Sequence, residues 1–128
     1  MASFSEAELG YLLGERRLGR LATVDAAGLP HVVPVGWRYN PELGTIDVSG
    51  RNLTATKKFR NVRENPKAAF VVDDLVSVSP WRPRSVMVQG SAQAIEATPT
   101  AVGPGGGGAM IRVVPEKIVS WGLGASGG

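Results

Sequence analysis

The chain has 128 residues, of which 43% are hydrophobic and 20% charged, with a formal net charge of +3 and a pI near 9.7. These values are typical of a globular domain, and no apolar run approaches the ~18 residues that would indicate a membrane span. The absence of cysteine excludes disulfides, thiolate metal sites and thiol catalysis, and the single histidine excludes a multi-histidine metal site within one chain.

The domain organisation follows from the same numbers. We expect one domain over residues 1–128, because the length falls in the single-domain range and no composition shift marks a second module. Residues 1–10 lack the charged-then-apolar order of a signal peptide, so we expect a cytoplasmic protein with no membrane partner.

The first predicted element is a short helix over residues 5–14. Ser5 to Glu8 fits a capping box, and Leu9, Leu12 and Leu13 have helical spacing. After residue 19 the apolar period changes to that of strands. Residues 21–24 and 31–39, joined by a turn at 25–28, predict a hairpin, and the strict alternation of residues 45–49 predicts a third strand.

The second half repeats this order. Residues 54–64 have a helical pattern that ends at Asn65-Pro66, and strands are predicted at 68–72 and 86–95, with Gly90 marking a bulge or a close backbone approach. We expect residues 110–114 and 117–121 to form the last strand or pair of strands, residues 98–108 a flexible glycine-rich loop, and residues 122–128 a frayed tail. Six strands mostly in hairpin order with two short helices predict a mainly β fold, a closed antiparallel barrel.

A basic segment without any acidic residue is the most informative feature. It contains Arg51, Lys57, Lys58, Arg60 and Arg63, and small hydroxyl residues directly precede the lysines at the predicted helix start. Backbone N–H groups, hydroxyls and ammonium groups together suit a phosphate dianion. A solvated basic helix face is the alternative. A nucleic-acid patch is disfavoured, because the net charge is only +3 and basic residues do not interleave with aromatic ones elsewhere.

The other motifs are weaker. Gly103 to Gly108 matches G-x-G-x-x-G, but a strand follows it and Pro104 lies inside it, so it is interpreted as a linker. The dipeptide Asp73-Asp74 is interpreted as a turn that ends a strand. Residues 80–84 and Trp121 place tryptophans beside arginines near strand ends, where they could cover a planar heterocycle or equally form a dimer interface or a barrel plug.

Four segments in this order resemble the pyridoxamine 5'-phosphate oxidase-like split barrels, within them the actinobacterial branch that depends on the deazaflavin coenzyme F420. They are Leu18-Gly19-Arg20-Leu21-Ala22-Thr23 with residues 28–35, Thr56-Lys57-Lys58-Phe59-Arg60-Asn61-Val62 with Asn65-Pro66, residues 84–90, and residues 111–113 with 120–122. The resemblance covers residues 6–123. It implies a six-stranded split barrel that forms a homodimer, with the coenzyme in a groove built by both subunits. The glycine-rich stretch 98–108 departs from the family pattern.

The resemblance also implies where the coenzyme would lie. Thr56, Lys57 and Lys58 would bind the phosphate, with Arg60 or Asn61 helping. Pro34, Val35 and Gly36 would lie along the flavin-like ring, and Ser49, Gly50 and Arg51 would approach the ribityl chain. Trp81, Arg84 and Trp121 would be further contacts.

The chemistry implied is hydride transfer by the coenzyme, with no catalytic side chain and no metal. The expected reaction is reduction of a small electron-poor organic substrate, such as an alkene, quinone or tetrapyrrole, by reduced F420. Two alternatives stay open. One is an FMN-dependent oxidase or reductase that uses the same phosphate site, and the other is a non-catalytic protein that binds a flavin, deazaflavin or tetrapyrrole.

Overall fold

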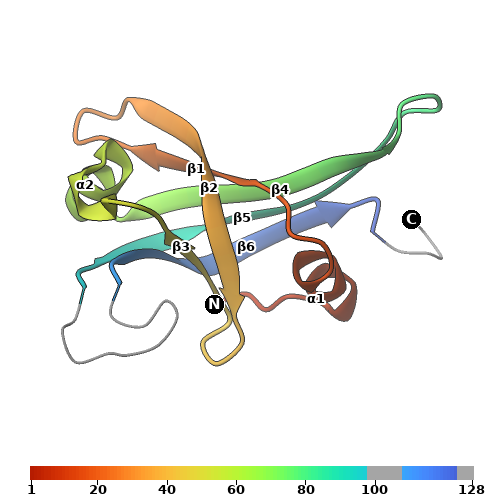
Figure 1. Cartoon of the computed structure of the whole chain (residues 1–128), viewed down its shortest axis with the longest axis horizontal. Helices are drawn as coiled ribbons and strands as arrows, with labels where there is room; N and C mark the ends of the chain where they lie inside the picture. Colours follow the sequence, from red (N-terminus) through yellow and green to blue (C-terminus); the bar gives the residue numbers. More distant parts are fainter. Residues whose placement is uncertain (98–107, 124–128) are drawn as a thin grey trace.

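The computed structural model describes residues 1–97 and 108–123, and within them six antiparallel strands close into a barrel in the order β1-β2-β3-β6-β5-β4 (Figure 1). The elements are α1 (Glu6–Leu13), β1 (Gly19–Val24), β2 (Pro30–Asn40), β3 (Thr45–Ser49), a 3₁₀ turn (Leu53–Ala55), α2 (Lys57–Glu64), β4 (Lys67–Ser77), β5 (Arg82–Ile95) and β6 (Met110–Trp121). The predicted antiparallel barrel of six strands with two helices is confirmed.

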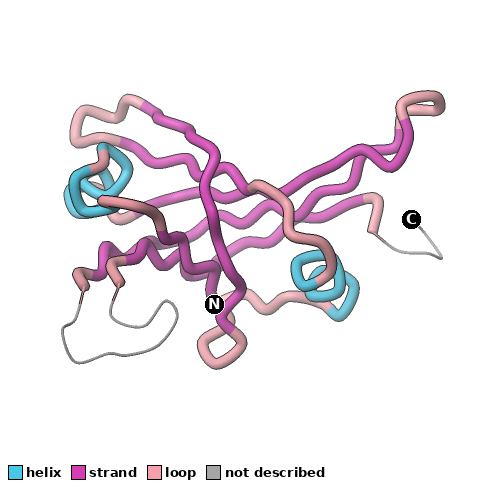
Figure 2. Tube along the Cα trace, viewed as in Figure 1, coloured by secondary structure: helices cyan, strands magenta, loops and turns pink. Residues whose placement is uncertain are grey.

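Alternation along the strands builds the core. Leu21 of β1, Phe70 of β4 and Val88 of β5 point inward and are at most 1% exposed. Helix α2 contributes Phe59 and Val62, which are also buried, so this helix closes one end of the barrel. Figure 2 shows the two helices at opposite ends of the sheet. No helix in the described part of the chain is long and apolar enough to cross a bilayer.

Side chains at the helix starts fix the helix boundaries. In α1 the predicted capping box is present: Ser5 Oγ accepts from the Glu8 N–H at 3.1 Å, and the Glu8 carboxylate accepts from the Ser5 N–H at 2.8 Å. In α2 the cap is Thr56, whose Oγ1 accepts from the Phe59 N–H at 3.4 Å. The helix therefore begins at Lys57 rather than at Thr54, and the 3₁₀ turn precedes it.

Two predicted strand boundaries were wrong. Strand β4 continues past residue 72, so Asp73 and Asp74 lie inside the strand and do not form a turn. They pair with Ser85 and Arg84 of a β5 that begins at Arg82, four residues before the predicted start. The C-terminal pair of apolar segments forms a single strand, β6.

Gly90 confirms the predicted close backbone approach. The pairing of β5 with β6 shifts register between Gln89 and Gly90, and a Cβ atom on Gly90 would lie 1.9 Å from the Val114 carbonyl oxygen. Only glycine fits where two backbones come this close. The glycine-rich loop predicted at 98–108 and the tail predicted at 122–128 lie mostly outside the described residues.

Candidate functional site

The barrel brings three separate sequence segments together beside α2. Gly36 of β2 pairs with Ser49 of β3, so residues 34–36 lie next to residues 49–51. The 3₁₀ turn then leads directly from Arg51 to Thr56 at the start of α2. The residues expected to face the coenzyme ring, its ribityl chain and its phosphate thus follow one another along one side of the barrel.

The β2–β3 part of this side is a strip of bare backbone. Gly36, Ser49 and Gly50 are exposed, and a Cβ atom on either glycine would meet no other atom within 4 Å. Pro34 is also exposed, whereas the Val35 side chain is buried in the core and offers only its backbone. Gly36 and Gly50 leave room for a flat ring to approach the backbone, so the residues present fit a flavin-type ring system.

The expected phosphate site is cationic. Arg51, Lys57 and Arg60 are exposed and Lys58 is half-buried, and none of the four forms a salt bridge within residues 1–97 and 108–123. The N–H groups in the first turn of a helix have no intrahelical acceptor. A doubly charged phosphate ester fits this end of α2 by charge and by hydrogen bonding.

The Thr56 hydroxyl and the Asp25 carboxylate belong to the surroundings of Lys57 and Lys58. Thr56 Oγ1 donates to the Leu53 carbonyl at 2.6 Å while it caps α2, so this side chain shapes the turn. Asp25 lies in the β1–β2 turn and accepts from the Leu29 N–H at 2.9 Å. That bond is the main reason why the pKa of Asp25 is below its ordinary value, and the charge of Lys57 adds to the effect. Lys57 therefore lies near the β1–β2 turn.

Asn61 differs from its expected role. Its side chain is 1% exposed, and its Nδ2 donates to Thr23 Oγ1 at 3.1 Å inside the barrel. To reach a ligand at the surface it would have to leave a buried hydroxyl without its partner, which costs about 1–3 kcal/mol. Asn61 therefore fastens α2 to β1 and does not face the phosphate site.

Trp81, Arg84 and Trp121 do not join the other expected residues within one chain. They lie at the β4–β5 hairpin and at the end of β6, at the opposite end of the molecule from α2 (Figure 1). Trp81 and Trp121 are 67% and 53% exposed. Arg84 donates to both carboxylate oxygens of Asp74, at 3.0 Å and 2.5 Å, and this bonding is the main cause that lowers the pKa of Asp74 to about 2.

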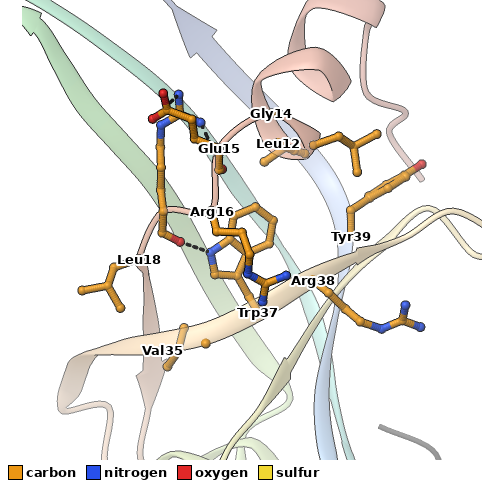
Figure 3. A pocket seen from close by; sticks show the side chains of 12 residues that line it. Leu12, Gly14, Glu15, Arg16, Leu18, Val35, Trp37, Arg38 and Tyr39 are labelled. Atoms are coloured by element: carbon orange, nitrogen blue, oxygen red, sulfur yellow. Dashed lines mark hydrogen bonds and ion pairs between the residues drawn. The ribbon is translucent and has the colours of Figure 1, made fainter. Parts of the chain in front are cut away.

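The sequence did not indicate a cavity of about 390 Å³ between the α1–β1 connection and β2 (Figure 3). The cavity begins where the pairing of β2 with β1 ends. Val35 is the last β2 residue that pairs with β1, and residues 36–40 pair with β3. The lining residues are Leu12, Leu13, Gly14, Glu15, Arg16, Arg17, Leu18, Val35, Gly36, Trp37, Arg38 and Tyr39. Because Val35 and Gly36 also belong to the bare backbone strip, the cavity and the strip are neighbours.

The wall of this cavity is firmly attached to the barrel. Trp37 Nε1 donates to the Arg17 carbonyl at 2.8 Å, and the Arg17 guanidinium donates to the Tyr11 carbonyl at 3.0 Å. The same guanidinium lies 4.1 Å from the Tyr11 ring centre and forms a salt bridge of 3.4 Å with Asp74. Burial, together with the hydrogen bond to Asp74, raises the pKa of Tyr11 well above its ordinary value, so this phenol stays protonated as a donor.

Solved structures of low sequence identity share this fold. A conserved hypothetical protein of Mycobacterium tuberculosis, Rv2991, has a TM-score of 0.71 and 22% identity over 94% of this chain and 86% of its own. The FAD binding protein from Mycobacterium smegmatis has a TM-score of 0.63 and 23% identity over 94% of this chain and 97% of its own. A structure named F420 reductase has a TM-score of 0.63 and 22% identity over 86% of this chain and 94% of its own.

Sequence comparison gives a much nearer relative. The 5a,11a-dehydrotetracycline/5a,11a-dehydrooxytetracycline reductase of Streptomyces rimosus is 42% identical over 120 residues, which cover 94% of this chain and 84% of that protein. The family model described as pyridoxamine 5'-phosphate oxidase matches residues 5–103. This chain therefore belongs to the pyridoxamine 5'-phosphate oxidase family.

Proposed function

We propose that this protein is a reductase that uses coenzyme F420 to reduce a small electron-poor organic substrate. The observation that carries the proposal is the 42% identity, over 94% of the chain, to a reductase of Streptomyces rimosus. The site agrees with this assignment, because it offers a bare backbone strip and a cationic helix start. A coenzyme would then supply the hydride, and the protein would supply binding, orientation and water exclusion.

Each part of the site has a distinct task in this proposal. The ammonium groups of Lys57 and Lys58 hold the coenzyme phosphate, with Arg51 and Arg60 adding to the positive field. The backbone of residues 34–36 and 49–50 carries the ring system. The coenzyme supplies the hydride when bound, so the chain needs only to hold the ring and the substrate in contact and to keep water away.

The working unit in this proposal is a homodimer. Trp81, Arg84 and Trp121 lie at the end of the barrel opposite α2, so only a second copy could bring them to the coenzyme. A two-fold interface must be self-complementary. The outer face of β2, β1 and β4 suits such a contact: Val32 is 63% exposed, and Ala22 pairs with both Val32 and Ala69 beside a hollow of about 550 Å³.

F420 is favoured over FMN because the structural neighbours include a protein named F420 reductase and the relative of Streptomyces rimosus is named a reductase rather than an oxidase. The neighbour named FAD binding protein supports a flavin-type ligand in the broader sense. An FMN-dependent enzyme on the same site is the alternative. It would bind FMN at least as tightly as F420, and the protein would be yellow when purified from a host that makes no deazaflavin.

Activity is tested by anaerobic mixing of the protein with reduced F420 and 5a,11a-dehydrooxytetracycline. We expect the absorbance of oxidised F420 to return only when protein and acceptor are both present. The same assay with reduced FMN in place of reduced F420, at the same concentration, shows which coenzyme the reaction uses. If F420 binds but no acceptor from a panel of conjugated ketones and quinones is reduced, the protein is a carrier and the reductase proposal is wrong.

A further inference from the structure

We propose that the cavity between the α1–β1 connection and β2 is the substrate subsite, and that it takes a planar polycyclic molecule carrying an anionic oxygen, bound by Arg16 and Arg38. This inference rests on the proposed function, because it assigns the second partner of the same hydride transfer.

The position of the cavity is the one that the reaction requires. Hydride donor and acceptor must come within about 3–3.5 Å of each other. Val35 and Gly36 line the cavity and also belong to the strip proposed to carry the coenzyme ring. A molecule in the cavity therefore lies at the edge of that ring. With about 390 Å³, the cavity is within the ~300–1,000 Å³ range of small-molecule sites.

The charge of the cavity is positive and unbalanced. Four charged side chains line it: Glu15, Arg16, Arg17 and Arg38. Arg17 is neutralised by Asp74 at 3.4 Å and by Glu15 at 3.8 Å. The guanidinium groups of Arg16 and Arg38 form no salt bridge or hydrogen bond in the described part of the chain. Both side chains are exposed, and in Figure 3 Arg16 lies beside Trp37 whereas Arg38 extends away from it. Planar guanidinium groups at two points of the cavity rim favour a ligand with enolate, phenolate or carboxylate oxygens.

The remaining lining favours a flat, largely apolar body. Trp37 is held by its bond to the Arg17 carbonyl and by edge contact with Phe70, with ring centres 5.3 Å apart. In Figure 3, Leu18 and Val35 lie toward one end of the cavity and Leu12 and Tyr39 toward the other, with Arg16 and Trp37 between them. A fixed indole with apolar side chains on either side and an arginine beside it suits a fused ring system with an anionic substituent.

The same arginines would stabilise charge that develops during the reaction. A conjugated enone takes a hydride at its β-carbon, the C=C π pair moves toward the carbonyl, and the carbonyl oxygen becomes an enolate. A proton from solvent at the α-carbon then gives the saturated ketone. The two electrons come from the reduced coenzyme. A guanidinium beside the enolate oxygen stabilises it more than it stabilises the neutral ketone.

Binding of two matched probes tests the subsite without any turnover. Anthraquinone-2-sulfonate and 2-(hydroxymethyl)anthraquinone share a planar tricycle, but only the first is anionic. We expect the sulfonate to bind the wild-type protein about tenfold more tightly than the neutral probe by titration calorimetry. In ¹⁵N NMR spectra we expect both probes to shift the indole N–H signal of Trp37, assigned with Trp37→Phe, more than those of Trp81 and Trp121.

Arginine variants then locate the anion preference. Arg16→Gln and Arg38→Gln should each weaken binding of the sulfonate about tenfold and leave binding of the neutral probe unchanged. Arg16→Lys and Arg38→Lys should restore part of it. Arg63→Gln is the matched control, because it removes the same charge from α2, where Arg63 pairs with Glu96 outside the cavity.

Two results would overturn the subsite: an unmoved Trp37 indole signal at saturating probe, or equal affinity of the sulfonate for wild type and both glutamine variants. F420 affinity is measured in the same variants and is expected to be unchanged. If the protein fails to bind F420 while the probe results hold, the proposed coenzyme is wrong and the anionic subsite still stands.

Discussion

Replacing Lys57 and Lys58 together by alanine should weaken F420 binding about a hundredfold. A charge-assisted hydrogen bond contributes about 1.5–3 kcal/mol when it is shielded from water. Lys58 is half-buried and should contribute near the lower end of that range, whereas the exposed Lys57 is screened by solvent and should contribute about 1 kcal/mol. The sum, about 2.5–3 kcal/mol, corresponds to a change in Kd of roughly a hundredfold.

Titration calorimetry at two salt concentrations measures this effect. The wild-type affinity should fall as salt rises, and the double variant should lose most of that dependence, because screening acts on the same charges. Arg63→Ala, which removes a charge from the last turn of α2 where Arg63 pairs with Glu96, should leave the affinity for F420 nearly unchanged. Equal affinity of wild type and double variant, with the fold intact by circular dichroism, would show that the phosphate lies elsewhere.

Three further predictions concern the parts of the fold that hold the site. Asp74→Asn should lower the free energy of unfolding in urea by about 2 kcal/mol at pH 7, because Arg84 and Arg17 lose their shared carboxylate. In the wild type the folded-state pKa of Asp74 is about 2, below its value in the unfolded chain. The stabilisation by Asp74 is therefore complete above about pH 4 and should disappear as the pH falls toward 2. An Asp74→Asn variant that loses as much stability in acid as the wild type would refute this. Gly90→Ala should cost about 1–3 kcal/mol by thermal unfolding, because its methyl group would overlap the Val114 carbonyl, and an unchanged melting temperature would contradict the close approach. Asn61→Ala should lower stability by about 1–3 kcal/mol while leaving the Kd for F420 unchanged, and a large rise in Kd would return Asn61 to the phosphate site.

The sequence predicted the elements with a clear local signal. The alternation of residues 45–49 and the capping box at Ser5 were enough to place β3 and α1. The ends of β4 and β5 were missed because Asp73 and Asp74 have the composition of a turn, whereas in the structure Asp74 pairs with Arg84 across the hairpin. Such a cross-strand pair can be recognised only when the register is known.

Only the part of the site with a local sequence signal was predictable. The basic helix start was visible because hydroxyl and lysine residues are adjacent in sequence. The cavity was missed because its lining comes from residues 12–18 and 35–39, which are far apart in the sequence and lie together only where β2 exchanges β1 for β3 as its pairing strand. The separation of Trp81 and Trp121 from α2 likewise depends on barrel closure, in which β1 pairs with β4 and β3 with β6.

The most direct test of the proposed function is titration of the purified protein with oxidised F420 and, separately, with FMN under the same conditions. We predict saturable binding of F420 at one molecule per subunit, weaker binding of FMN, and loss of F420 affinity in the Lys57→Ala/Lys58→Ala variant. Absence of a heat signal and of a thermal shift with oxidised and with reduced F420 would contradict the central claim.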